Sequence, residues 1–173
     1  IGGPIPNLET MLDSKGFQRS DAIILASFLG YSVYVGRVVA GYLLDLVWAP
    51  ALACALLILP AISMYLFGAA APSYTQMVLA IVLLGIAAGV EYDLLAYFVS
   101  KYFGIKSYAR IYGTLYAIFG LGAGFGPAVF GSVFKNEGSY DIALQYSMWA
   151  FVICSVALLF LGRYRDERLK SMV

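Results

Sequence analysis

The longest uncharged run in the sequence is LVWAPALACALLILPAISMYLFGAAAPSYTQMVLAIVLLGIAAGV, which occupies residues 46–90. As a single helix this run would be roughly 67 Å long, about twice the thickness of the hydrocarbon core of a bilayer. It must therefore turn back on itself. The sequence predicts the break at Ala71-Pro72-Ser73-Tyr74, because Pro stops one helix and the polar pair that follows it starts the next. The run predicts two membrane-spanning helices.

The remaining charged residues divide the rest of the chain into further apolar spans. No charge occurs between Arg110 and Lys135 or between Asp141 and Arg163, and each interval is long enough for a spanning helix of about 20 residues. Upstream of the long run lies a fifth apolar stretch, interrupted by two charges. We therefore predict an all-α, polytopic membrane helix bundle with five transmembrane helices. The predicted spans are 22–47, 50–70, 74–100, 107–134 and 142–162, followed by a charged tail at 163–173.

The composition excludes several classes of protein. Hydrophobic residues make up 62% of the chain and charged residues only 12%, whereas about 25% of a typical soluble domain is charged. Eleven Lys and Arg balance ten Asp and Glu, so no nucleic-acid partner is expected. Histidine is absent, and no nucleophile elbow, metal-ligand pair or phosphate loop is visible. We expect neither an enzyme nor a metal or cofactor site, and read Cys54 and Cys154 as packing residues.

The shorter segments are expected to lie outside the membrane or at its surface. Residues 8–21 are predicted to form a polar extramembrane segment with a turn at Gly16, and residues 101–110 an interfacial connection. A tight polar loop is expected at 135–141. Residues 1–6 are similar to the tail of an earlier apolar segment, and the chain begins with Ile. We expect a piece of a longer polypeptide.

The basic residues predict the orientation of the bundle. With five spans, the 101–110 connection and the tail share one side of the membrane, which carries seven basic residues against three on the other. The positive-inside rule then places the C-terminus in the cytoplasm. The seven are Lys101, Lys106, Arg110, Arg163, Arg165, Arg168 and Lys170, and the three are Lys15, Arg19 and Lys135.

Arg37 is the first candidate for a functional residue, because it lies well inside the first span. An arginine at a helix centre costs roughly 2.5–3.5 kcal/mol on insertion scales and usually faces a polar cavity or a partner. Helical spacing places it on a stripe of small and polar residues that includes Tyr34 and Gly41. A guanidinium binds two carboxylate oxygens in one plane, which suits an anionic substrate. The alternative is a structural arginine that snorkels to the interface or pairs with a carboxylate.

Glu91 and Asp93 are the second candidates, in the cytoplasmic third of the third span. Two residues apart on a helix is about 200°, so their side chains point to nearly opposite faces and cannot both line one cavity. One is expected to pair with a basic group, while the other meets a pathway in which a carboxylate carries a proton. The alternative is a charge cluster with Lys101 or Arg110 that holds the helices together.

The fourth span is rich in glycine. Gly122 and Gly126 form a G-x-x-x-G pair that is followed at once by Pro127, and Gly131 comes one turn later. Small residues four apart let helices approach closely, and proline kinks a helix. This pattern indicates either a pore-lining helix that bends between states or static close packing.

Three stretches resemble the second half of the major facilitator superfamily. The run Gly36-Arg37-Val38-Val39-Ala40-Gly41-Tyr42-Leu43-Leu44-Asp45 fits G-R-x-x-x-G-x-L-x-D at the end of a helix and its short cytoplasmic loop. The run from Glu91 to Gly104 is similar to helix ten of bacterial members near the oxalate/formate antiporter and monocarboxylate porter branch. Gly122-x-x-x-Gly126-Pro127 is similar to the Gly-Pro motif of helix eleven.

The resemblance implies that the chain is the end of helix seven followed by helices eight to twelve, half of a transporter fold. Arg37 would then bind the substrate anion with Tyr34 beside it, and Glu91 or Asp93 would couple protons. Asp45, Lys101 and Arg110 would form the cytoplasmic gate. The implied partners are the lipid bilayer, a small organic solute and the N-terminal six-helix half, and the implied location is the bacterial inner membrane.

Two departures from the family pattern narrow this expectation. Residues 111–134 hold no Lys or Arg, so a second cation for a dicarboxylate is missing, and a monoanion or another solute fits better. The loop after Asp45 lacks the basic residues usual in the superfamily. The sequence favours a secondary transporter of a small organic anion that works by alternating access. A non-transporting structural or assembly protein of the membrane, or a transporter of a non-anionic solute, remains the alternative.

Overall fold

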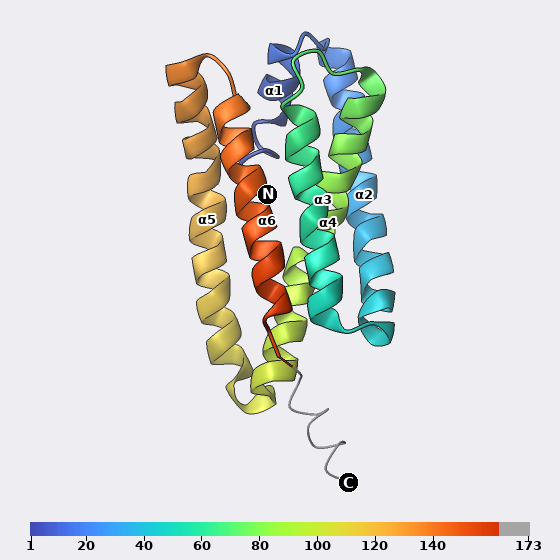
Figure 1. Cartoon of the computed structure of the whole chain (residues 1–173), viewed down its shortest axis with the longest axis vertical. Coiled ribbons are helices and arrows are strands. Elements are labelled where there is room, and N and C mark those ends of the chain that lie inside the picture. The colour runs from blue at the N-terminus through green and yellow to red at the C-terminus, as the bar shows by residue number, and fades with distance from the viewer. Residues whose placement is uncertain (163–173) are drawn as a thin grey trace.

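The computed structural model describes residues 1–162 and shows a bundle of long α-helices (Figure 1). Five of these helices are long and apolar enough to cross a membrane, which confirms the predicted all-α class and its five spans. The predicted tail, residues 163–173, lies outside the described residues. The helices are α1 (Leu8–Ser14), α2 (Arg19–Leu46), α3 (Ala49–Phe67), α4 (Tyr74–Phe103), α5 (Tyr108–Glu137) and α6 (Asp141–Leu159), with a 3-10 turn, η1 (Ile105–Ser107), before α5.

Capping residues and glycines set the ends of the helices. At the predicted break in the long uncharged run, α4 begins directly after Ser73, whose hydroxyl accepts a hydrogen bond from the backbone N–H of Gln76 at 3.3 Å. The N–H of Ser73 in turn donates to Oε1 of Gln76 at 2.8 Å, which satisfies two of the donors that a helix start leaves open. Helices α4 and α5 end at Gly104 and Gly138, whose φ angles of 72° and 70° suit glycine.

The five spanning helices are packed unevenly. Helix α2 lies along α4, and α3 lies against both α4 and α6 (Figure 1). Helix α5 stands at the edge of the bundle, next to α6 in the view of Figure 1. Phe130 is its only buried residue in the part of the chain that the structure describes. Most of the surface of α5 is therefore free to face lipid, solute or another polypeptide segment.

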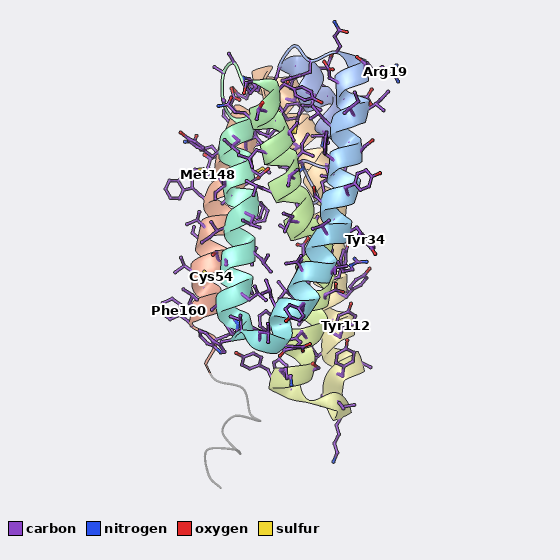
Figure 2. All side chains as sticks on the ribbon, turned by 90° about the vertical axis from the view of Figure 1, so that its right-hand side faces the viewer. Arg19, Tyr34, Cys54, Tyr112, Met148 and Phe160 are labelled. Atoms are coloured by element: carbon purple, nitrogen blue, oxygen red, sulfur yellow. The ribbon has the colours of Figure 1, made fainter. Side chains whose placement is uncertain are left out.

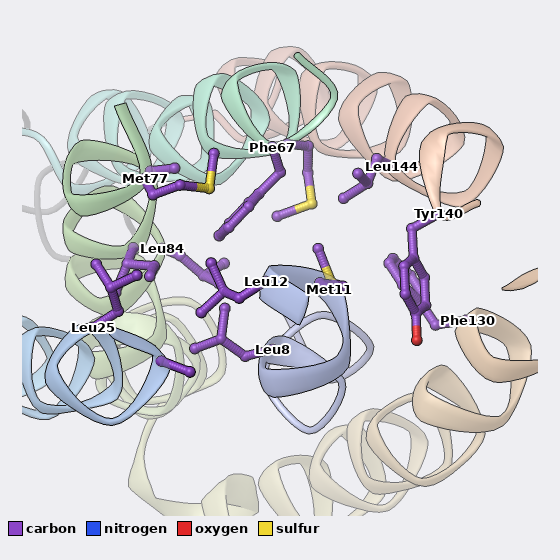
Figure 3. Packing of buried hydrophobic residues seen from close by; sticks show 14 of the residues in the cluster. Leu8, Met11, Leu12, Leu25, Phe67, Met77, Leu84, Phe130, Tyr140 and Leu144 are labelled. Carbon is purple, nitrogen blue, oxygen red and sulfur yellow. The ribbon is translucent and has the colours of Figure 1, made fainter. Parts of the chain in front are cut away.

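The short helix α1 closes one end of the bundle, which we call the α1 end. Its Leu8, Met11 and Leu12 are buried in a cluster to which all five long helices contribute (Figure 3). Residues 8–21 are therefore more than the polar extramembrane segment that we predicted. The three apolar residues have helical spacing and pack inward, while Glu9 and the other polar residues of this helix face outward. The predicted turn at Gly16 is present, with a φ of 84°.

A second cluster of buried residues lies toward the opposite end. It joins α2, α3 and α4 through small and aliphatic side chains, and α5 adds no residue to it within the described part of the chain. Val90 and Leu94 of α4 belong to this cluster, and both are buried. These two residues flank Glu91 and Asp93 in the sequence, so the packed core fixes the part of α4 that carries the two acidic candidates.

Candidate functional site

The predicted stripe on α2 lies on the unburied side of that helix. Tyr34, Arg37 and Gly41 are all exposed, and the side chain of Tyr34 is 72% accessible. The opposite face of α2 is buried against α4 through residues such as Ser32 and Gly36. Figure 2 shows Tyr34 projecting away from the bundle axis, on the same side as Tyr112 of α5.

Glycines hold α2 and α4 close together. A Cβ on Gly36 would lie 2.6 Å from the carbonyl oxygen of Ile86, and one on Gly85 would lie 2.7 Å from the Cβ of Ser32. A Cβ on Gly89 would overlap the carbonyl oxygen of Val33. Because no side chain fits at these three glycines, the two backbones approach closely. This contact brings the Arg37 side chain within reach of α4.

Arg37 and Asp93 form an ion pair between α2 and α4. The Nε of Arg37 lies 3.3 Å from Oδ2 of Asp93, and the same Nε–H donates a hydrogen bond to the carbonyl oxygen of Gly89 at 3.2 Å. The two side chains remain 56% and 46% exposed. The structure thus brings together two of the predicted site residues, and it adds the Gly89 carbonyl, which the sequence does not mark.

Glu91 lies apart from this pair. It lines an open cleft of about 480 Å³ between α4, α5 and α6, together with Phe119, Gly122 and residues 1–4. Glu91 and Asp93 therefore face different spaces, as their spacing of two residues on one helix requires. Of the two acidic candidates, only Asp93 forms an ion pair with Arg37 among the described residues.

A row of aromatic side chains runs along α5 and meets α4 near the ion pair. On α5, Tyr108 stacks on Tyr112 with ring centroids 5.4 Å apart, and Tyr112 stacks on Tyr116 at 5.8 Å. On α4, Tyr92 lies 5.9 Å from Tyr116 and 4.9 Å from Phe119. We call these five residues the aromatic row. We did not predict the aromatic row from the sequence, although tyrosines at 108, 112 and 116 share one face of a helix by their spacing of four.

Of the three residues predicted for a cytoplasmic gate, Asp45 and Arg110 form no ion pair with another described residue. Asp45, at the end of α2, is exposed and has no cationic partner among residues 1–162. Lys101 lies over the ring of Tyr97 at 5.7 Å, and Arg110 is exposed near the start of α5. The gate therefore stays a prediction.

The glycines that we predicted to serve in helix packing have different surroundings. No atom lies within 4 Å of a Cβ built on Gly41, Gly122 or Gly131. Gly126 packs against the N-terminal segment, because its Cβ would lie 3.0 Å from the backbone nitrogen of Gly3. Pro127 lies inside α5, one turn before the buried Phe130. Close packing of long helices is found instead between α2 and α4.

Comparisons with known proteins identify the family of the chain. The sequence model of the family "Major Facilitator Superfamily" matches residues 1–171. Monocarboxylate transporter 9 of Pongo abelii is 30% identical over 165 residues, and that of Gallus gallus is 28% identical over 168 residues. Each alignment covers 92% of this chain and 32% of the relative, so the chain spans about a third of the length of the curated relatives that it matches. No solved structure matches significantly.

Proposed function

Because the chain belongs to the major facilitator superfamily, we propose that it is the C-terminal half of a secondary transporter in which Arg37 binds a small organic anion. The observation that carries this proposal is a half-exposed arginine inside a membrane-spanning helix, held at its base by Asp93. The names of the curated relatives support a monocarboxylate-like solute, and they favour a transporter over an enzyme.

The geometry of Arg37 supports anion binding. Both of its contacts within the described residues are made by Nε, the nitrogen nearest the aliphatic stem. The two terminal nitrogens carry four further N–H groups and remain available to a ligand. A carboxylate that accepts two of these N–H groups forms the bidentate pair that guanidinium geometry favours. Tyr34, one turn earlier on the same exposed stripe, would flank the bound anion.

The rest of the proposal concerns the complete transporter. The five apolar helices and the family make the chain an integral membrane protein, and α2 to α6 would correspond to helices eight to twelve. An N-terminal six-helix half would close the site from the other side, and the two halves would rock about it. Glu91 or Asp93 would carry the coupled proton. We also propose that the protein lies in the bacterial inner membrane with its C-terminus in the cytoplasm.

The test is uptake by the full-length protein in proteoliposomes, with a panel of radiolabelled monocarboxylates that includes lactate, pyruvate and 3-phenyllactate. Replacement Arg37→Gln removes the cation and keeps a shorter, uncharged polar side chain. We expect it to abolish uptake of every acid that the wild type transports, while insertion into the membrane is retained. Arg19→Gln is the matched control, because Arg19 lies at the α1 end and its side chain is 85% exposed. Unchanged uptake in Arg37→Gln would overturn the proposal.

A further inference from the structure

We propose that the aromatic row selects a carboxylic acid that carries an aromatic ring, with the carboxylate on Arg37 and the ring on Tyr92 and Tyr116. This inference rests on the proposed function of Arg37 and adds the class of substrate. None of the five residues of the aromatic row is charged, so the row cannot supply the cation that holds the carboxylate.

The first support is the position of the row relative to the ion pair. Tyr92 precedes Asp93 in α4, so its Cα lies 3.8 Å from that of the residue that contacts Arg37. From Tyr92 the contacts continue to Tyr116 and Phe119 of α5. The contact between Arg37 and Asp93 and the contact between Tyr92 and Tyr116 thus begin at neighbouring residues of α4 and link it to α2 and α5, and we call these four residues the wall. The proposed ligand is a molecule in which two or three bonds separate the carboxylate from the ring, with the carboxylate at Arg37 and the ring at the tyrosines.

The second support is that the rings of this wall are accessible. Tyr92 is 37% exposed and Tyr116 is 46% exposed, and neither belongs to a buried cluster. Their rings meet at an interplanar angle of 43° and do not stack face to face, which leaves ring surface open. A further ring can add to such a group in an offset or edge-to-face arrangement.

The third support is the charge beside the row. A surface that faces lipid does not carry a half-exposed arginine and aspartate, because ionised groups in hydrocarbon are costly. Arg37 and Asp93 are half exposed next to Tyr92, so this part of the surface faces an aqueous space or another polypeptide segment. Tyr112 and Tyr108 extend the row along α5 toward the α4–α5 connection. A solute that leaves the site in that direction stays in contact with rings.

The test is binding to the purified full-length protein, measured by isothermal titration calorimetry with three acids of the same head group. These are lactate, 3-cyclohexyllactate and 3-phenyllactate, so that the second and third differ in the π-system at similar size. We expect 3-phenyllactate to bind about fivefold to tenfold more tightly than 3-cyclohexyllactate. Tyr92→Leu and Tyr116→Leu should each remove most of this difference, and Tyr92→Phe should preserve it, because the ring remains.

The control is Tyr146→Leu on α6, since Tyr146 is 75% exposed and lies outside the wall. It should leave the preference for the phenyl compound intact. Equal affinity of the wild type for the phenyl and cyclohexyl acids, with binding still lost in Arg37→Gln, would overturn the aromatic selectivity and leave the proposed function in place. Binding of all three acids that is insensitive to Arg37→Gln would overturn both.

Discussion

The Nε of Arg37 lies 3.3 Å from Oδ2 of Asp93, so the cation of the candidate site already faces a carboxylate within its own half of the bundle. Asp93 and the carbonyl oxygen of Gly89 both contact Nε, the guanidinium nitrogen nearest the aliphatic stem of Arg37. The pair fixes the direction of the Arg37 side chain and at the same time lowers its attraction for an external anion. Asp93 is thus both a positioning residue and a competitor.

Removal of this competitor should strengthen anion binding. In Asp93→Asn the amide keeps the size of the side chain but loses the negative charge. Pairs at this level of exposure contribute about 0–1 kcal/mol, so we expect the dissociation constant of a monocarboxylate to fall by up to about fivefold. Calorimetric titration of the full-length protein measures this change. Glu137→Gln is the matched control, because Glu137 is exposed at the end of α5, has no proposed role in the site, and should leave the affinity unchanged. Weaker binding in Asp93→Asn would contradict this account.

The close approach of α2 and α4 should make Gly36 intolerant of any side chain. The Cβ of Gly36→Ala would lie 2.6 Å from the carbonyl oxygen of Ile86, a backbone atom that cannot move aside cheaply. We expect the free energy of unfolding to fall by about 1–3 kcal/mol, the usual cost of overpacking. The substitution should also displace Arg37. Thermal unfolding of the full-length protein in detergent is the measurement. Gly41→Ala, on the same helix with nothing within 4 Å, should be neutral or slightly stabilising. Equal unfolding temperatures for the two variants would refute the close contact.

The sequence predicts the helices better than it predicts their contacts. Uncharged runs and the Pro72-Ser73 break mark the spans because the length of a helix and the thickness of a bilayer are fixed quantities. The partner of Arg37 is a different problem. Asp93 is one of several acidic residues in the sequence. It pairs with Arg37 because Gly36, Gly85 and the neighbouring small residues determine which faces of α2 and α4 meet.

The glycines illustrate the same limit. The sequence analysis selected Gly122 and Gly126 because they are four apart and precede a proline. Gly85 and Gly89 have the same spacing on α4, yet they lie in an aliphatic run that hides the pattern. The spacing of glycines shows that one face of a helix carries small residues. Only the packing shows whether another helix lies against that face. Part of the aromatic row was missed for a related reason, since the contacts of Tyr92 with Tyr116 and Phe119 join two helices.

Lys15 should stabilise the α1 end. Its Nζ donates a hydrogen bond to the carbonyl oxygen of Ala69 at 3.1 Å and pairs with Oδ1 of Asp141 at 3.2 Å, while its side chain is only 16% exposed. It thereby links α1 to the α3–α4 connection and to the start of α6. We expect Lys15→Ala to reduce stability by about 1–3 kcal/mol, because a carbonyl oxygen loses its charged donor. The matched control is Arg19→Ala, whose pair with Glu9 is exposed on both sides and should contribute little. Equal unfolding temperatures in detergent for the two alanine variants would contradict the stabilising role of Lys15.

The predicted orientation can be checked by cysteine labelling in intact cells. In a full-length protein with every native cysteine, Cys54 and Cys154 included, replaced by Ala, a single cysteine is introduced either at Lys106 or at Ser139. Lys106 lies in η1 between α4 and α5, and Ser139 lies between α5 and α6, so the two positions are at opposite ends of α5. The excess of basic residues at the Lys106 end predicts that this end lies in the cytoplasm. A membrane-impermeant maleimide should therefore label Ser139→Cys and leave Lys106→Cys unlabelled until the cells are permeabilised. The reverse pattern of labelling would show that the bundle is inserted the other way round.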